Sequence, residues 1–157
     1  MGAGYSGGIT VILYHFCCER DMRGIRNKGI TKGMICCETR IPQPAGKPDK
    51  WSMLMIQDWQ WITLDGERCR QSWATQFMIH YDRTEYRWTI DMPEKETDSL
   101  YDRDRLAERF PGSERLFDEW AGSENWRVYH GPIPKKWLVK LEHWNREEGE
   151  WEEIWAR

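Results

Sequence analysis

Hydrophobic and β-branched residues fill positions 9–16, which read Ile-Thr-Val-Ile-Leu-Tyr-His-Phe. Such a run predicts a β-strand that is buried on both faces. Residues 21–28 place their apolar side chains on one side and are followed by Gly29, so they predict a short helix that ends at this glycine. The chain is then expected to return as a second strand over residues 30–37.

Three prolines and a glycine interrupt residues 41–50, which predicts a loop and makes this segment the longest candidate for a mobile lid. Strand character resumes over residues 59–64. Apolar residues then recur at every fourth position within residues 68–80, which predicts a helix with an apolar stripe. Residues 85–92 alternate again and predict a strand.

The last third of the chain mixes short helices with strands. Residues 100–120 predict one or two short helices, while residues 126–129 and 137–141 predict strands. The tail, residues 144–151, is expected to form a hairpin. Because strands and helices do not alternate regularly, the order predicts an α+β fold. We expect a single compact domain with a split, mainly antiparallel sheet and short helices around a cleft.

Length and composition narrow this picture. The 157 residues fit one domain, and we expect residues 9–157 to form it behind a flexible, glycine-rich leader at residues 1–8. Eleven Trp, six Tyr and four Phe supply a large hydrophobic driving force. No apolar run is long enough to span a bilayer, and the leader lacks the features of a secretory signal. These features predict a soluble, cytoplasmic protein without membrane contact.

Charge and cysteine content argue against two kinds of site. The net charge is −3, with acidic and basic residues interspersed along the chain, which argues against a broad phosphate-binding face but leaves a local basic groove possible. Cys17-Cys18 and Cys36-Cys37 are adjacent pairs, and neighbouring residues on a strand point to opposite faces. Two such sulfurs do not converge on one ion, so we expect no metal site and reduced, buried thiols instead.

Common catalytic motifs are absent from the sequence. There is no phosphate-binding P-loop, no G-x-S-x-G elbow, no H-E-x-x-H and no calcium-binding loop. His15 near the end of the first strand is a positional candidate, although a lone histidine on a buried strand is usually a hydrogen-bonded core residue.

Several short segments resemble the ADP-ribosyltransferase superfamily. The opening, Leu13-Tyr-His-Phe16 followed by a short helix and Lys28-Gly-Ile30, is similar to the family's first strand, which carries a His, and the turn after its helix. Trp61-Ile-Thr-Leu-Asp65 resembles the third core strand, and Gln71-Ser-Trp-Ala74 the helix that follows it. Residues 126–134 resemble a later strand, before which the family places a Glu.

The resemblance implies an enzyme that uses NAD as a substrate and transfers ADP-ribose to a protein or nucleic-acid acceptor. His15 and Tyr14 would contact the NAD ribose, while Trp61, Thr63 and Gln71 would complete the NAD site. Trp61 or Thr63 would replace the family's usual Tyr. Glu124, the nearest acidic residue before the later strand, would be the catalytic carboxylate, although it lies farther from the strand centre than the family pattern predicts.

Two alternatives remain open. An RNA 2′-phosphotransferase would belong to the same superfamily and would need basic residues around a phosphate, for which Arg23, Arg26 and Lys32 are available. The acidic balance of the chain weakens this alternative. The other is a non-catalytic interaction module, such as a small inhibitor or phage accessory protein, because tryptophan is enriched at protein interfaces as well as in cores.

Overall fold

The computed structural model describes residues 8–68, 83–118, 120 and 122–157. Residues 1–7 of the predicted leader, and residues 69–82 with most of the helix predicted over 68–80, lie outside this part of the chain. The strands within it are β1 (Thr10–Cys17), β2 (Met34–Ile41), β3 (Lys50–Gln57), β4 (Trp59–Thr63), β5 (Tyr86–Pro93), β6 (Leu100–Tyr101), β7 (Trp126–His130), β8 (Leu138–Asn145) and β9 (Glu150–Ala156). The α-helices are α1 (Glu19–Lys28), α3 (Arg103–Arg109) and α4 (Arg115–Asp118), and the 3-10 helices are η1 (Glu94–Ser99), η2 (Ser123–Asn125) and η3 (Lys135–Trp137).

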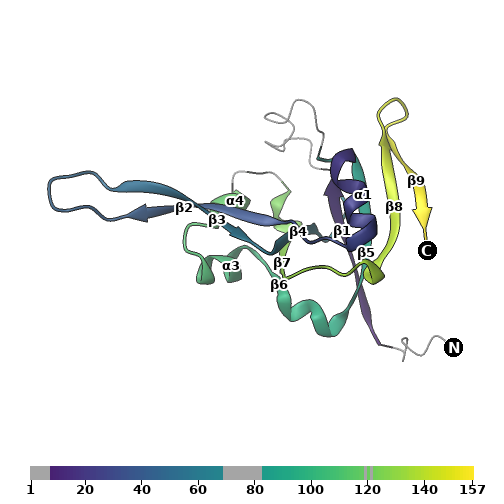
Figure 1. Cartoon of the computed structure of the whole chain (residues 1–157), viewed down its shortest axis with the longest axis horizontal. Coiled ribbons are helices and arrows are strands. Elements are labelled where there is room, and N and C mark those ends of the chain that lie inside the picture. The colour runs from purple at the N-terminus through teal and green to yellow at the C-terminus, as the bar shows by residue number, and fades with distance from the viewer. Residues whose placement is uncertain (1–7, 69–82, 119, 121) are drawn as a thin grey trace.

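Seven strands form one sheet in the order β6-β7-β4-β1-β5-β8-β9, and all its neighbours run antiparallel. β2 and β3 form a separate two-stranded hairpin that extends away from this sheet (Figure 1). Helices and a mainly antiparallel sheet confirm the predicted α+β class. The hairpin expected in the tail is also present, as β8 and β9.

The two halves of the seven-stranded sheet meet where β1 lies beside β4. β1 pairs with β5 along its whole length, from Thr10 opposite Pro93 to Cys17 opposite Tyr86. Between β1 and β4, whose residues are all described, the ladder consists of one pair, Tyr14 opposite Thr63. The central strand is therefore bonded firmly on one side and at a single position on the other.

Two apolar clusters hold the fold together. The larger one contains Leu13, Trp88 and Leu141 from the sheet and Ile25 from α1. The smaller one lies around Trp59, at the β4–β7 end of the sheet, and includes residues from α3, α4 and β2. Each cluster buries an aromatic ring completely, which is where much of the stabilising free energy of this tryptophan-rich chain arises.

The sequence predicted that β1 is buried on both faces, and this prediction is wrong. Leu13 and Cys17 are buried, but Ile12 on the opposite face is 46% exposed. α1 contacts β1, and its Ile25 belongs to the same cluster as Leu13 and Cys17. A run of apolar residues thus marks a central strand here, but not a strand enclosed on two sides.

The hairpin corrects the predictions for residues 30–57. The second strand begins at Met34 instead of residue 30, and residues 50–57, which were not predicted as a strand, form β3. The proline-rich loop connects β2 to β3 at the far tip of the hairpin, distant from β1 (Figure 1). That position does not support a lid over the central strands.

Candidate functional site

Four of the residues predicted to bind NAD meet at the junction of β1 and β4. Tyr14 and Thr63 lie directly opposite each other as the one backbone pair of this junction. The Nδ1 atom of His15 lies 2.6 Å from the backbone oxygen of Trp61. The imidazole therefore bonds to β4 just beyond the point where backbone pairing stops. Tyr14 and His15 are successive residues of β1, so their side chains point to opposite faces of the sheet, and the group is adjacent through its backbone positions.

His15 is held as a neutral imidazole. Burial lowers its pKa below the ordinary value of 6.5, and the bond to the Trp61 carbonyl and the charge of Asp21 oppose this shift only in part. A carbonyl oxygen only accepts hydrogen bonds, so Nδ1 carries the proton and donates it. In a neutral ring the Nε2 atom is then an acceptor. Such an atom can receive a hydrogen bond from a hydroxyl group.

A tight turn after β4 supports Tyr14 and Thr63. The backbone N–H of Gly66 donates to the Thr63 hydroxyl at 3.2 Å. Gly66 has φ +67°, and a Cβ at this position would lie 3.0 Å from the Tyr14 ring. Only glycine fits both the conformation and the close approach. The turn thus fixes the ring of Tyr14 beside Thr63.

A buried ion pair continues this group onto β5 and β8. Arg87 donates from Nε (3.1 Å) and Nη2 (2.8 Å) to the same carboxylate oxygen of Glu142, and from Nη1 to the Gly66 carbonyl at 2.9 Å. Its guanidinium lies 5.3 Å from the centre of the Tyr14 ring and 4.5 Å from that of Trp151. Sequence reasoning missed this pair; the only signal for it is a charged residue within the alternating strand.

Trp61 has its side chain engaged in packing. Its indole N–H donates to the Met34 carbonyl at 3.1 Å, and its ring lies 5.4 Å from Phe117 and 6.0 Å from Trp126, measured between ring centres. The ring is thus part of the smaller apolar cluster. Its backbone carbonyl is the group that contacts His15.

Glu124 lies in η2, immediately before β7. The neighbouring Asn125 anchors η2 to the end of β4, because its carbonyl accepts from the Leu64 N–H at 2.9 Å and its side chain donates to Asp65 at 2.7 Å. The next residue, Trp126, pairs with Thr63. The backbone beside Glu124 is therefore tied to the same end of β4 as Thr63.

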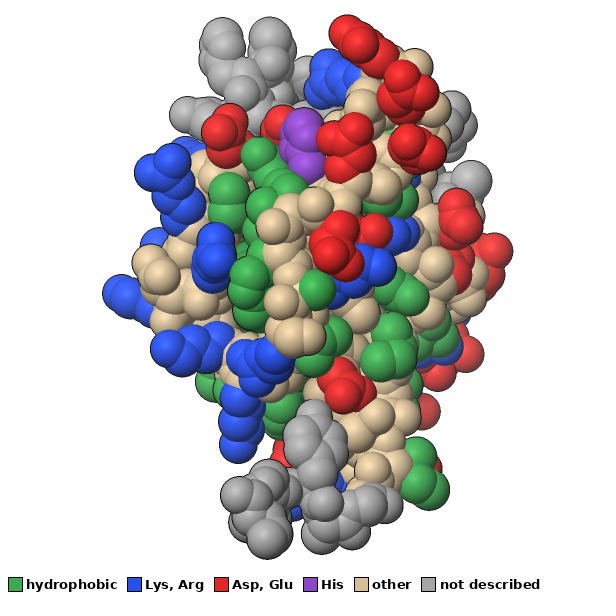
Figure 2. Space-filling model, turned by 90° about the vertical axis from the view of Figure 1, so that its right-hand side faces the viewer, with side chains coloured by type: hydrophobic (Ala, Val, Ile, Leu, Met, Phe, Trp, Pro, Cys, Tyr) green, Lys and Arg blue, Asp and Glu red, His purple; other side chains and the backbone are tan. Residues whose placement is uncertain are grey.

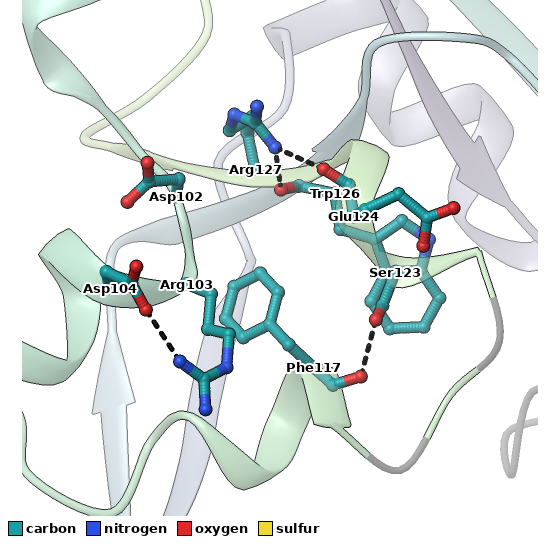
Figure 3. A pocket seen from close by; sticks show the side chains of 8 residues that line it. All are labelled: Asp102, Arg103, Asp104, Phe117, Ser123, Glu124, Trp126 and Arg127. Carbon is teal, nitrogen blue, oxygen red and sulfur yellow. Dashed lines mark hydrogen bonds and ion pairs between the residues drawn. The ribbon is translucent and has the colours of Figure 1, made fainter.

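The exposed Glu124 side chain lines a polar pocket of about 290 Å³ (Figure 3). The pocket is formed by residues of α3, α4, η2 and β7 and the residue before α3: Asp102, Arg103, Asp104, Phe117, Ser123, Glu124, Trp126 and Arg127. His15, Tyr14 and Thr63 do not line it. The structure thus brings Glu124 to the end of β4 but not into contact with the group at the β1–β4 junction.

Two arginines line the pocket and bond to groups around it. Arg103 bonds to Asp118 at 2.5 Å and to Asp104 at 2.6 Å, and its hydrogen bond lowers the pKa of Asp118. Arg127 donates to the backbone oxygens of Glu124 and Trp126, at 2.9 and 2.8 Å. The Asp104 and Asp118 carboxylates therefore share one guanidinium, whereas that of Glu124 extends into solvent beside the pocket.

Burial keeps three of the four cysteines in the described part of the chain unreactive. Cys17, Cys18 and Cys37 are buried, and burial raises the pKa of each thiol, so all three stay protonated at neutral pH. Cys36 is half-buried. Within the described ranges, no group of His, Cys, Asp and Glu side chains has the arrangement of a metal site.

Gln71 lies outside the described residues. In comparisons with protein families, curated proteins and solved structures, no match to this chain was found. Among the helices of the described part of the chain, none is long and apolar enough to cross a membrane.

Proposed function

We propose that this chain binds NAD and transfers ADP-ribose to a macromolecular acceptor, as an ADP-ribosyltransferase-like enzyme. The observation that carries the proposal is the group formed by Tyr14, His15, Trp61 and Thr63. These residues belong to two distant segments of the sequence, and their backbone positions are adjacent at the junction of β1 and β4.

The chemistry needs a hydrogen-bond acceptor for the ribose and a negative charge near its C1′ atom. His15 supplies the first, because its neutral ring leaves Nε2 free of a proton to accept from a ribose hydroxyl. When the bond between C1′ and the nicotinamide nitrogen breaks, the electron pair leaves with nicotinamide and positive charge develops on the ribose. A carboxylate stabilises that charge. The acceptor then bonds to C1′ and releases its proton to solvent.

Glu124 is the carboxylate that we assign to this role. Asn125 ties its backbone to Leu64 and Asp65, at the end of the strand that also carries Thr63. Its side chain is exposed and free to turn toward a ligand bound over β4. NAD would extend from the β1–β4 junction along β4 toward η2, where Trp126 pairs with Thr63.

A charge-removing substitution tests this assignment. Glu124→Gln should lower NAD turnover by about two to four orders of magnitude, because it removes a group that acts on the transition state. NAD affinity should stay nearly unchanged. Glu108→Gln, at an exposed position of α3, is the matched control and should retain full activity. Turnover is measured as NAD consumption and as transfer of labelled ADP-ribose into a cell lysate.

The ground-state contact is tested separately. His15→Ala should leave the domain folded and weaken NAD binding by about 1–3 kcal/mol, the cost of one lost hydrogen bond in a desolvated site.

Equal activity of wild type and Glu124→Gln would remove Glu124 from the mechanism. If NAD at high concentration fails to raise the melting temperature of the wild type, the proposed function is wrong, since saturation at a hundred times Kd should add about 2.7 kcal/mol.

One observation favours an interaction module as the second candidate function. Trp51, Met53 and Met55 on β3 are 61%, 57% and 60% exposed and lie on one face of the hairpin. Exposed apolar side chains gathered in this way mark interaction surfaces, and methionine adapts to partners of different shape. A wild type that neither binds nor consumes NAD would make this function the better one.

A further inference from the structure

Six basic side chains belong to three segments that lie against one another. They come from α1, from η3 and from the end of the chain, and they are Arg23, Arg26, Lys28, Lys135, Lys136 and Arg157. All six are exposed. Across the residues that the structure describes, none of the six forms an ion pair with an acidic side chain. We refer to them as the basic surface.

Backbone contacts hold the parts of this surface in fixed positions. Ile30, just after α1, exchanges two hydrogen bonds of 2.9 Å with Ile133, just before η3. Gly29 lies so close to this segment that a Cβ on it would be 2.9 Å from the backbone nitrogen of Lys135. Arg157 donates to the Lys136 and Lys135 carbonyls at 2.9 and 3.2 Å. The basic residues are thus placed together before any ligand arrives.

The acidic residues of α1 lie at the other end of the helix. Glu19 and Asp21 are in its first turn, and Asp21 accepts a bond from the Cys18 thiol at 3.5 Å. The basic residues Arg23, Arg26 and Lys28 occupy the later turns. Since a helix rises ~1.5 Å per residue, these three positions span about 7–8 Å along its axis.

Charges that alternate along the sequence are therefore separated in space. Figure 2 shows Lys and Arg along the left side of the molecule, where α1 lies, and Asp and Glu at the top and right. The turn and strand after β8 contain five exposed Glu, within residues 147–153. The net charge of −3 does not reveal this separation, which is compatible with the local basic groove that the sequence left possible.

We propose that the basic surface binds the phosphate backbone of a nucleic acid. Exposed Lys and Arg side chains that are not neutralised by an acidic side chain bind phosphates and release their counterions, which provides affinity without base recognition. The inference does not depend on the proposed enzymatic function, because binding at this surface needs no NAD.

Binding is measured by fluorescence anisotropy with labelled 20-residue single-stranded DNA, single-stranded RNA and duplex DNA of mixed sequence, at 50 to 200 mM salt. The variant K135E/K136E reverses two charges of the surface, and K47E/K50E makes the same change at the hairpin. Lys47 and Lys50 are exposed and belong to the loop and the first position of β3, in the hairpin that extends away from the rest of the fold (Figure 1). The separate variant R23E tests the helix side, and circular dichroism checks that each variant is folded.

We expect K135E/K136E to weaken binding by about tenfold or more at 50 mM salt and to reduce the salt slope for duplex DNA by about 2. R23E should weaken binding as well, whereas K47E/K50E should change it less than about twofold. The three nucleic acids identify the preferred form. The proposal is overturned if the wild type binds none of them at 50 mM salt, if the hairpin variant loses as much affinity, or if polyglutamate competes as well as nucleic acid.

Discussion

Replacing Arg87 tests whether the buried ion pair stabilises the group around Tyr14. Arg87→Met keeps an unbranched side chain but removes the guanidinium, and with it the bonds to Glu142 and to the Gly66 carbonyl. The side chains of Arg87 and Glu142 are 17% and 8% exposed. After the substitution, the Glu142 carboxylate keeps its ion pair with Lys140. The Lys140 Nζ atom lies 3.6 Å from Glu142 Oε2, and the Lys140 side chain is 40% exposed.

The expected loss follows from this geometry. Removing one partner of a buried pair costs about 3–5 kcal/mol, because the other charge stays desolvated. Lys140 offsets part of that cost, which places the expected loss at about 3–4 kcal/mol. A domain of this size is stable by about 5–15 kcal/mol in total. The melting temperature should fall by about 6–16 °C.

Urea unfolding followed by tryptophan fluorescence measures the loss. Arg40→Met is the matched control: it breaks an ion pair with Asp49 in which the Arg40 side chain is 66% exposed, and it should cost less than about 1 kcal/mol. The double variant R87M/E142L should recover stability relative to R87M, since no buried charge remains. An R87M variant as stable as R40M, or a double variant with no recovery, would refute the reasoning.

Two further predictions concern His15 and the end of α1. Burial lowers the pKa of His15 in the folded protein below 6.5. As the pH falls below 6.5, the unfolded chain binds a proton on this ring more readily than the folded protein does, so the free energy of unfolding decreases. The stabilising contribution of the neutral ring is therefore complete above pH 6.5 and is lost below it. His15→Gln should therefore show a smaller drop in unfolding free energy between pH 7.5 and 5.5 than the wild type, and identical drops would contradict this. Gly29→Ala should destabilise by about 2 kcal/mol or more, since φ is +85° and a Cβ would lie 2.3 Å from the Ile133 oxygen. Gly24→Ala, with open space inside α1, should instead stabilise by about 0.5–1 kcal/mol; urea midpoints that shift in the same direction for both would be inconsistent with this account.

The elements that could be predicted are those whose own pattern determines them. The alternation over residues 85–92 and the glycine after residues 21–28 gave β5 and α1 nearly to their ends. β3 has no such pattern, because most of its side chains are exposed on both faces, and hydrophobic periodicity arises only where one face is buried. A strand in a projecting hairpin therefore cannot be predicted from hydrophobic periodicity.

The candidate site was predictable only in part. Tyr14, His15, Trp61 and Thr63 followed from a resemblance, and their contiguity depends on strand pairing that no local pattern encodes. The pairing of Arg87 with Glu142 is set by the register of β5 against β8, across distant parts of the chain. Arg23 and Arg26 were recognised as basic residues available to a phosphate, but the contacts that place α1, η3 and the end of the chain together could not be predicted from the sequence.

The position of β1 at the centre of the sheet has a consequence for synthesis on the ribosome. Thr10 pairs with Pro93, so the strand that is translated first waits for β5 before its ladder can form. At ~5–20 residues per second, that interval lasts about 4–17 s. β8 and β9, by contrast, are neighbours and can pair as soon as they emerge. For about half of the translation of these 157 residues, the nascent chain thus carries β1 without its main pairing partner, a state in which an apolar strand is prone to aggregate.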